Sequence, residues 1–142
     1  MIQPNNVFIE GKRGQVVLGK SVYNKRQIGS FYEECAVQYL VEKNYQILER
    51  NFHAGRSGEI DIIARDETGL LVICECKYRL DESHGDPLLA VNYRKQRQIC
   101  RTTLYYYVRH GYGMDYPCRF DVIALYGNGE IKHIENAFEF VR

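Results

Sequence analysis

Charged residues interrupt two apolar, strand-like runs in the middle of the chain. Asp61 lies inside the run 60–64, Glu75 lies inside the run 70–76, and Lys77 follows that second run directly. Moving a charged side chain out of water is costly unless the charge is paired or binds a metal. Two carboxylates and an ammonium at these positions therefore indicate a functional site in place of ordinary core.

The faces on which these three side chains lie follow from strand geometry. Side chains alternate along a strand, so Glu75 and Lys77 share one face. We predict a three-residue loop at 67–69, with Gly69 in the left-handed position, because this loop places Asp61 directly opposite Glu75. A loop of two or four residues would instead place Asp61 on the other face.

The chemistry that suits such a group is hydrolysis of a phosphodiester. Two carboxylates about 5 Å apart repel each other unless a cation lies between them or one of them is protonated. Mg²⁺ commonly takes one or two carboxylates together with substrate phosphate, and Lys77 could stabilise charge on the phosphate or on an attacking water. The alternative is an ion pair on a solvent-facing edge strand, because the pattern Glu-x-Lys also begins at Glu10 and Glu130.

Two helices and several strands must position these residues. Apolar residues recur every three or four positions from about residue 29 to 43 and from about residue 92 to 110, which is typical of amphipathic helices. Gly111 is a plausible end of the second helix. The predicted strands are residues 45–52, 60–64, 70–76 and 118–125, and residues 131–138 form either a last strand or an irregular tail.

The length of the chain fits a single domain. Its 142 residues, 45% of them hydrophobic, can bury a core of that size. Residues 1–27 show no sustained period and are predicted to form a poorly ordered arm, in which a short strand could occur. Residues 28–142 are predicted to form the domain itself.

Charge, cysteine content and hydropathy narrow the class of protein. The 19 basic and 18 acidic residues give a net charge of +1, so a polyanion must be held by a local patch. The five cysteines lie mostly in apolar runs, which indicates reduced thiols in a cytosolic protein. No stretch has the roughly 18 apolar residues of a membrane span, and we expect a cytoplasmic protein without membrane contact.

A basic cluster opens the second predicted helix. Its members are Arg94, Lys95, Arg97 and Arg101. They could grip the phosphates on either side of a scissile bond, or they could form an ordinary solvated face. Gln96, in the middle of the cluster, points along the apolar stripe of the helix.

Several short blocks between about residue 29 and residue 138 occur together in one known family. These blocks are Gly29, 33–36, 39–40, 58–64, Glu75-x-Lys77, 85–87, 90–91, 95–96, 118–122 and 133–138. On these residues the chain resembles the YraN-like proteins of the restriction-endonuclease-like PD-(D/E)xK superfamily. It is also similar to archaeal Holliday junction resolvases.

The resemblance implies an α/β fold, in which a mixed central sheet is flanked by helices in the order α-β-β-β-α-β. It also implies a nuclease-like site that binds Mg²⁺ or Mn²⁺. Asp61, Glu75, the main-chain carbonyl of Cys76 and Glu33 would hold the metal, and Lys77 and Gln96 would complete the catalytic group. Glu34 suits the site less well than Glu33, because it lies about 100° further around the helix.

The function that follows is a metal-dependent endonuclease acting on DNA, branched DNA such as Holliday junctions included. The basic cluster would bind the DNA, and a homodimer would suit two cuts in a four-way junction. The alternative is a catalytically silent module that keeps the nuclease fold and binds nucleic acid or a protein partner, because a fold does not by itself establish an activity.

Overall fold

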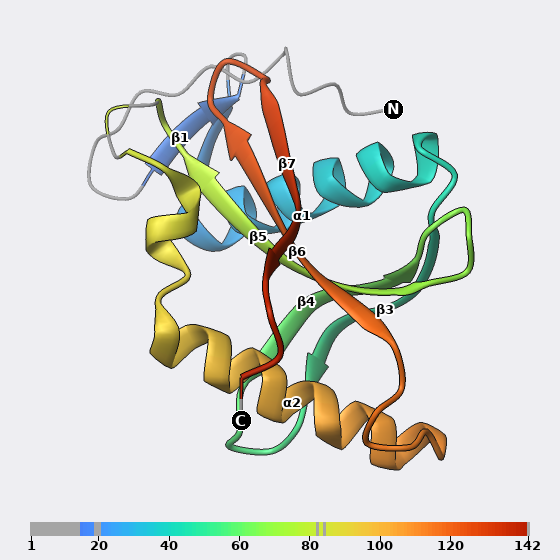
Figure 1. Cartoon of the computed structure of the whole chain (residues 1–142). Coiled ribbons are helices and arrows are strands. Elements are labelled where there is room, and N and C mark those ends of the chain that lie inside the picture. Colours follow the sequence, from blue (N-terminus) through green and yellow to red (C-terminus); the bar gives the residue numbers. More distant parts are fainter. Residues whose placement is uncertain (1–14, 19–20, 82, 84, 142) are drawn as a thin grey trace.

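Two helices pack on opposite sides of a twisted sheet (Figure 1). The structure is a computed structural model that describes residues 15–18, 21–81, 83 and 85–141. Its elements are β1 Gln15–Leu18, β2 Ser21–Asn24, α1 Lys25–Glu42, β3 Gln46–His53, β4 Glu59–Arg65, β5 Leu71–Arg79, the 3₁₀ helix η3 Pro87–Ala90, α2 Tyr93–His110, β6 Cys118–Tyr126 and β7 Ile131–Phe138.

The main sheet has the strand order β3-β4-β5-β6-β7. Neighbouring strands are antiparallel except β5 and β6, which are parallel and are joined through η3 and α2. A parallel pair requires such a crossover connection. The sheet is therefore mixed, and the predicted order α-β-β-β-α-β is confirmed from α1 to β6. The last segment is a strand, β7, and not an irregular tail.

Each face of the sheet carries its own apolar core. Cys74 on β5 packs with Leu40 of α1, whereas the preceding Ile73 packs with Ile99 of α2. This alternation is the two-residue period of a strand buried on both faces. The predicted apolar stripes of both helices are the faces that pack on the sheet. The five cysteines are free thiols, as predicted.

The helix ends agree with the sequence at α2 and differ at α1. The Asn92 side chain accepts a hydrogen bond from Lys95 N and caps α2, and Gly111 ends it at φ 72°. Helix α1 begins at Lys25, four residues before the predicted start, so the expected boundary at residue 28 falls within it. Strands β1 and β2 pair within the predicted N-terminal arm. The rest of that arm, residues 1–14 and 19–20, lies outside the described residues.

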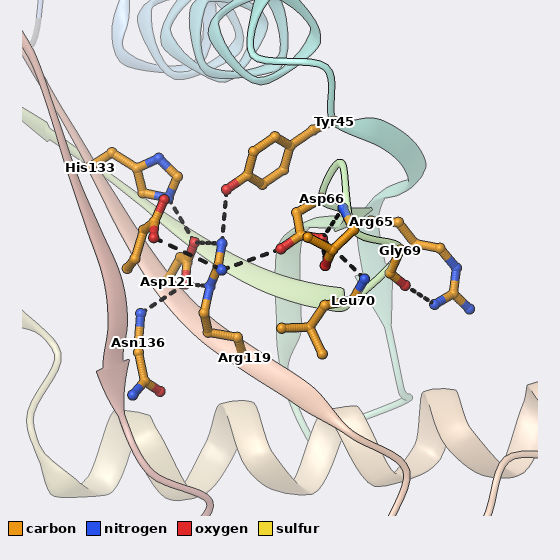
Figure 2. Close-up of polar contacts among 11 residues, drawn as sticks. Tyr45, Arg65, Asp66, Gly69, Leu70, Arg119, Asp121, His133 and Asn136 are labelled. Carbon is orange, nitrogen blue, oxygen red and sulfur yellow. Dashed lines mark hydrogen bonds and ion pairs between the residues drawn. The ribbon is translucent and has the colours of Figure 1, made fainter.

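A buried polar network joins β6 and β7 beneath α1 (Figure 2). The Asp121 side chain is fully buried and accepts two hydrogen bonds from the Arg119 guanidinium, at 2.9 and 3.0 Å. It also accepts one from the Asn136 N–H at 3.0 Å, and His133 Nε2 lies 2.7 Å from Oδ2. Arg119 in turn donates to the Tyr45 hydroxyl at 2.8 Å. The carboxylate is therefore paired and fully hydrogen-bonded.

This pairing outweighs the cost of burying Asp121. Burial alone would raise the pKa of the Asp121 carboxyl, but the bonds from His133, Arg119 and the Asn136 N–H hold the pKa below its ordinary value. A depressed native pKa means that Asp121 contributes stability above the unfolded pKa of about 4. That contribution is lost as the pH falls through the native pKa.

We expect Asp121→Asn to lower the free energy of unfolding by about 3 to 5 kcal/mol, because it leaves Arg119 without its buried partner. Urea unfolding at pH 7 measures this change through the transition midpoint at unchanged slope. Glu135→Gln is the matched control, since Glu135 is exposed and lies 3.9 Å from Arg119. The control should cost less than about 1 kcal/mol. Equal stability of Asp121→Asn and the wild type would contradict this account of the network.

Candidate active site

The loop between β4 and β5 has the predicted three residues. Asp66 N donates to Leu70 O at 3.0 Å across the loop, and Gly69 has φ 90°. The Asp66 side chain fixes this turn, because its Oδ1 accepts hydrogen bonds from Thr68 N, Thr68 Oγ1 and Leu70 N at 2.9, 2.6 and 3.1 Å. Asp and Gly are therefore the residues that this turn needs.

The register that follows is the one that a three-residue loop gives. Ile62 pairs with Cys74 and Ile63 with Ile73, and the ladder ends one position before Asp61 and Glu75 would pair. Ile73 packs in the core on the α2 side, and strand alternation puts Glu75 on that side too. Ile60 and Ile63 both pack in that core, so the alternation of β4 is interrupted between them, where Asp61 lies. Asp61 is nevertheless close enough to Glu75 for the two charges to interact. The predicted three-residue loop and its register are confirmed.

The strands separate where Asp61 lies. The β4–β5 ladder is recorded from Arg65 back to Ile62, although β4 begins at Glu59. In place of a backbone acceptor, Asp61 Oδ2 accepts the hydrogen bond from Cys76 N at 2.8 Å. The carboxylate is thus held against the backbone of β5, next to the Cys76 carbonyl predicted as a metal ligand.

Two lysines surround Glu75, which is 5% exposed. Lys77 Nζ lies 3.2 Å from Glu75 Oε1, and Lys95 Nζ lies 3.4 Å from the same oxygen. Lys77 comes from β5, as predicted, whereas Lys95 comes from the first turn of α2. The positive end of that helix is therefore directed toward the site.

In the part of the protein that the structure describes, no ion pair neutralises the charge of Asp61. Burial, followed by the charge of Glu75, raises the pKa of the Asp61 carboxyl to about 7. Glu33 and Glu59 raise it further, and the hydrogen bond from Cys76 N opposes them. At neutral pH the Asp61 carboxyl is therefore partly protonated, whereas an ordinary aspartate loses its proton about three pH units lower.

The two neighbouring acids of α1, Glu33 and Glu34, lie in different surroundings. Glu33 of α1 is close enough for its charge to act on Asp61 and on Cys76. Glu34 instead forms an ion pair with Arg50 at 2.8 Å on the protein surface. The site thus receives Glu33 from one helical layer and Lys95 from the other.

Lys95, predicted to bind DNA, lies closer to the acidic pair than its neighbour Gln96 is shown to be. Gln96 Nε2 donates to Val91 O at 3.0 Å and supports the start of α2, whereas Lys95 reaches Glu75. Adjacent helix residues differ by about 100° in direction. The cap at Asn92 fixes this rotation, and it was the clue that sequence reasoning missed. The catalytic part predicted for Gln96 remains a prediction.

Gly58 brings the β3–β4 turn against α2. At this position φ is 135°, and an added Cβ would lie 2.6 to 2.8 Å from three atoms of the Gln98 side chain. A larger residue would be strained at this φ and would force the Gln98 side chain to move. The glycine before the Glu59-Ile60-Asp61 segment therefore has a packing reason to be there.

The oxygen atoms near Asp61 and Glu75 are the candidate ligands of the predicted metal. Within the described part of the chain, no group of three or more His, Cys, Asp or Glu side chains is arranged to hold a metal ion. Two carboxylates and one main-chain carbonyl remain, from Asp61, Glu75 and Cys76. This all-oxygen set fits Mg²⁺ or Mn²⁺, which keep several waters, and a cation would relieve the repulsion felt by Asp61.

Comparison with known sequences decides the family. The sequence model described as "Uncharacterised protein family UPF0102" matches residues 32–125. The chain belongs to the UPF0102 family. UPF0102 proteins from Thermodesulfovibrio yellowstonii and Lachnoclostridium phytofermentans are 46% and 45% identical to it; the alignments cover 79% and 82% of this chain and 96% of each relative. The YraN-like resemblance is confirmed, and the names of these UPF0102 relatives state no activity.

One solved structure is similar over most of the chain. It is Pyrococcus furiosus SfsA in complex with Ca²⁺, aligned over 92% of this chain and 69% of that chain. The identity is 13% and the TM-score is 0.35. Both values are too low for this likeness to bear on the site or its chemistry.

The raised pKa predicts an unusual pH dependence. Between pH about 4 and 7 native Asp61 keeps a proton that the unfolded chain has released, so its contribution to stability falls as the pH rises. In EDTA, Asp61→Asn should equal the wild type near pH 4 and exceed it by several degrees in Tm at pH 7.5.

Thermal melts at pH 4.5, 6.0 and 7.5 test this expectation. Glu34→Gln is the control, because the hydrogen bond from Arg50 lowers the pKa of Glu34. The contribution of Glu34 to stability therefore rises with pH, whereas that of Asp61 falls. Parallel pH profiles for Asp61→Asn and the wild type would contradict the raised pKa of the Asp61 carboxyl.

Proposed function

We propose that this protein is a Mg²⁺- or Mn²⁺-dependent endonuclease that cuts DNA, branched DNA included. The observation that carries the proposal is the pair Asp61 and Glu75, whose charges act on each other, with two lysines next to Glu75. Acidic pairs in a protein core are unfavourable unless they serve a ligand. A hard cation with a bound phosphate satisfies both the carboxylates and the lysines.

Each residue has a defined part in this proposal. Asp61, Glu75 and the Cys76 carbonyl hold the metal, and Glu33 completes the acidic cluster. When bound, a divalent ion polarises the phosphate and lowers the pKa of a coordinated water. Lys77, anchored 3.2 Å from Glu75, stabilises the charge that develops on the phosphate. Lys95 adds a second positive charge at the start of α2.

The basic residues of α2 supply the affinity for DNA. Arg94, Arg97 and Arg101 are exposed on the helix that delivers Lys95 to the site. Phosphate contacts of this kind position a duplex without reading its sequence. A homodimer would place two such sites on the two strands of a branched substrate.

A silent binding module is the second candidate. It is favoured by the two ammonium groups of Lys77 and Lys95, which neutralise Glu75 without a metal. In such a module the same lysines would bind nucleic acid or a protein partner, and no bond would be cut.

Metal binding and cleavage separate the two candidates. Millimolar Mg²⁺ should raise the Tm of the wild type, because the metal binds the folded state. Asp61→Asn should lose both this rise and the nicking of four-way DNA, while its DNA affinity stays nearly unchanged. Lys77→Ala should keep the rise and slow cleavage by about 10² to 10³.

The measurements are melting curves with and without Mg²⁺ or Mn²⁺, and nicking of linear, flapped and four-way DNA. Each is made on the wild type and on both variants. A wild type that gains no stability from either metal and cuts none of these substrates would leave the silent module as the function.

A further inference from the structure

The positive charge of this chain is concentrated on α2. The helix contains four arginines and Lys95 but no Asp or Glu, although the net charge of the chain is only +1. Among the ion pairs of the described residues, none involves Arg101 or Arg109 of α2, or Arg56 of the turn between β3 and β4. These arginines have no acidic partner within the described protein.

Arginine side chains from this group line two adjoining hollows between α2 and the β3–β4 turn. In Figure 1 this turn passes next to α2. The first hollow measures about 420 Å³ and includes Lys95. The second measures about 850 Å³ and reaches Arg109. Arg56, Ser57 and Arg101 line both of them, so the hollows form one trough along α2. Because Lys95 contacts Glu75, the trough starts at the candidate active site.

The walls of this α2 trough are fixed before any ligand binds. Gly58 allows the turn to approach Gln98, and Ser57 N donates to Ala54 O at 2.9 Å. The guanidinium of Arg109 lies over the ring of the buried Phe52, 5.0 Å from its centre. Such stacking restricts an arginine without removing its charge.

One aromatic side chain lies between the arginines. Tyr105 is 52% exposed and lines the second hollow together with Arg101 and Arg109, one helical turn to either side. Its neighbours Tyr106 and Tyr107 are buried in the core. A row of arginines with an aromatic ring between them suits a sugar-phosphate backbone, which presents regularly spaced anions and apolar sugars.

We propose that the α2 trough binds the backbone of the duplex arm on one side of the phosphate that is cut. Arg109 lies 14 residues after Lys95, so the two are separated by about 21 Å of helix. This length matches about six base pairs at 3.4 Å each. That the trough binds DNA is inferred from its arginines and its shape. That it lies beside the phosphate that is cut rests on the proposed function. The substrate class is thus DNA with a duplex arm of at least six or so base pairs next to the cut.

Salt dependence in EDTA tests the binding face without involving the metal. Arg56→Gln combined with Arg109→Gln removes two phosphate contacts and should reduce the slope of log K against log salt by about 1.8. Arg109→Lys keeps the charge and should retain its share of the slope. Lys43→Gln, directly after the end of α1 at the other side of the sheet, is the matched control and should change nothing.

An unchanged slope in the double variant, with an unchanged melting temperature, would overturn the proposal. Equally tight binding of a polyglutamate peptide would overturn it as well, because the trough would then suit an acidic protein. If Lys43→Gln also reduced the slope of log K against log salt, DNA binding would depend on overall charge and not on the α2 trough, and the proposal would be overturned.

Cleavage then locates the trough relative to the cut. With Mg²⁺, the wild type should cut hairpin-capped branched DNA with 12-base-pair arms at least tenfold faster than the same DNA with 4-base-pair arms. The double variant should lose this preference and cut both substrates at similar rates. Equal rates of the wild type on both substrates would overturn the placement beside the cut. If no variant cuts any DNA while the salt slope still changes, the proposed nuclease function fails and the binding face stands.

Discussion

Because side chains of a strand alternate between two faces, the loop between β4 and β5 decides which residues of the two strands face each other. The ladder from Arg65 to Ile62 has the register that a three-residue loop gives, and one residue more or less would shift every pair. This register leads β4 and β5 to the point where the charge of Glu75 acts on Asp61 and where Lys95 of α2 contacts Glu75. The candidate site therefore depends on this register.

Two aspartates on the same sheet show how differently a buried carboxylate can be treated. Asp121 is surrounded by donors, and its pKa is held below the ordinary value. Asp61 has one backbone donor and acidic neighbours, and its pKa is raised to about 7. The first contributes stability at neutral pH, and the second reduces it. Destabilisation of this kind is typical of sites shaped for a ligand that is added after folding.

Much of the fold and the acidic pair could be predicted from the sequence because they depend on local rules. The helix stripes follow a 3.6-residue period, and the hairpin register follows from the Asp66 to Leu70 turn. The contact between Lys95 and Glu75 could not be predicted, because it depends on how α2 is rotated against β5. The contribution of Arg56 was missed for the same reason, since only packing of Gly58 on Gln98 brings that turn to α2.

The Asp66 carboxylate has two partners at once, and this ties the local turn to a distant strand. Its Oδ1 holds the β4–β5 loop, and its Oδ2 lies 3.4 Å from Arg119 of β6, 53 residues further along the chain (Figure 2). Contacts between such distant residues form late in folding, because a long loop must first be closed. Until β6 joins the sheet, the β4–β5 loop lacks this anchor. The turn that sets the register next to Asp61 is therefore held completely only when the sheet itself is complete.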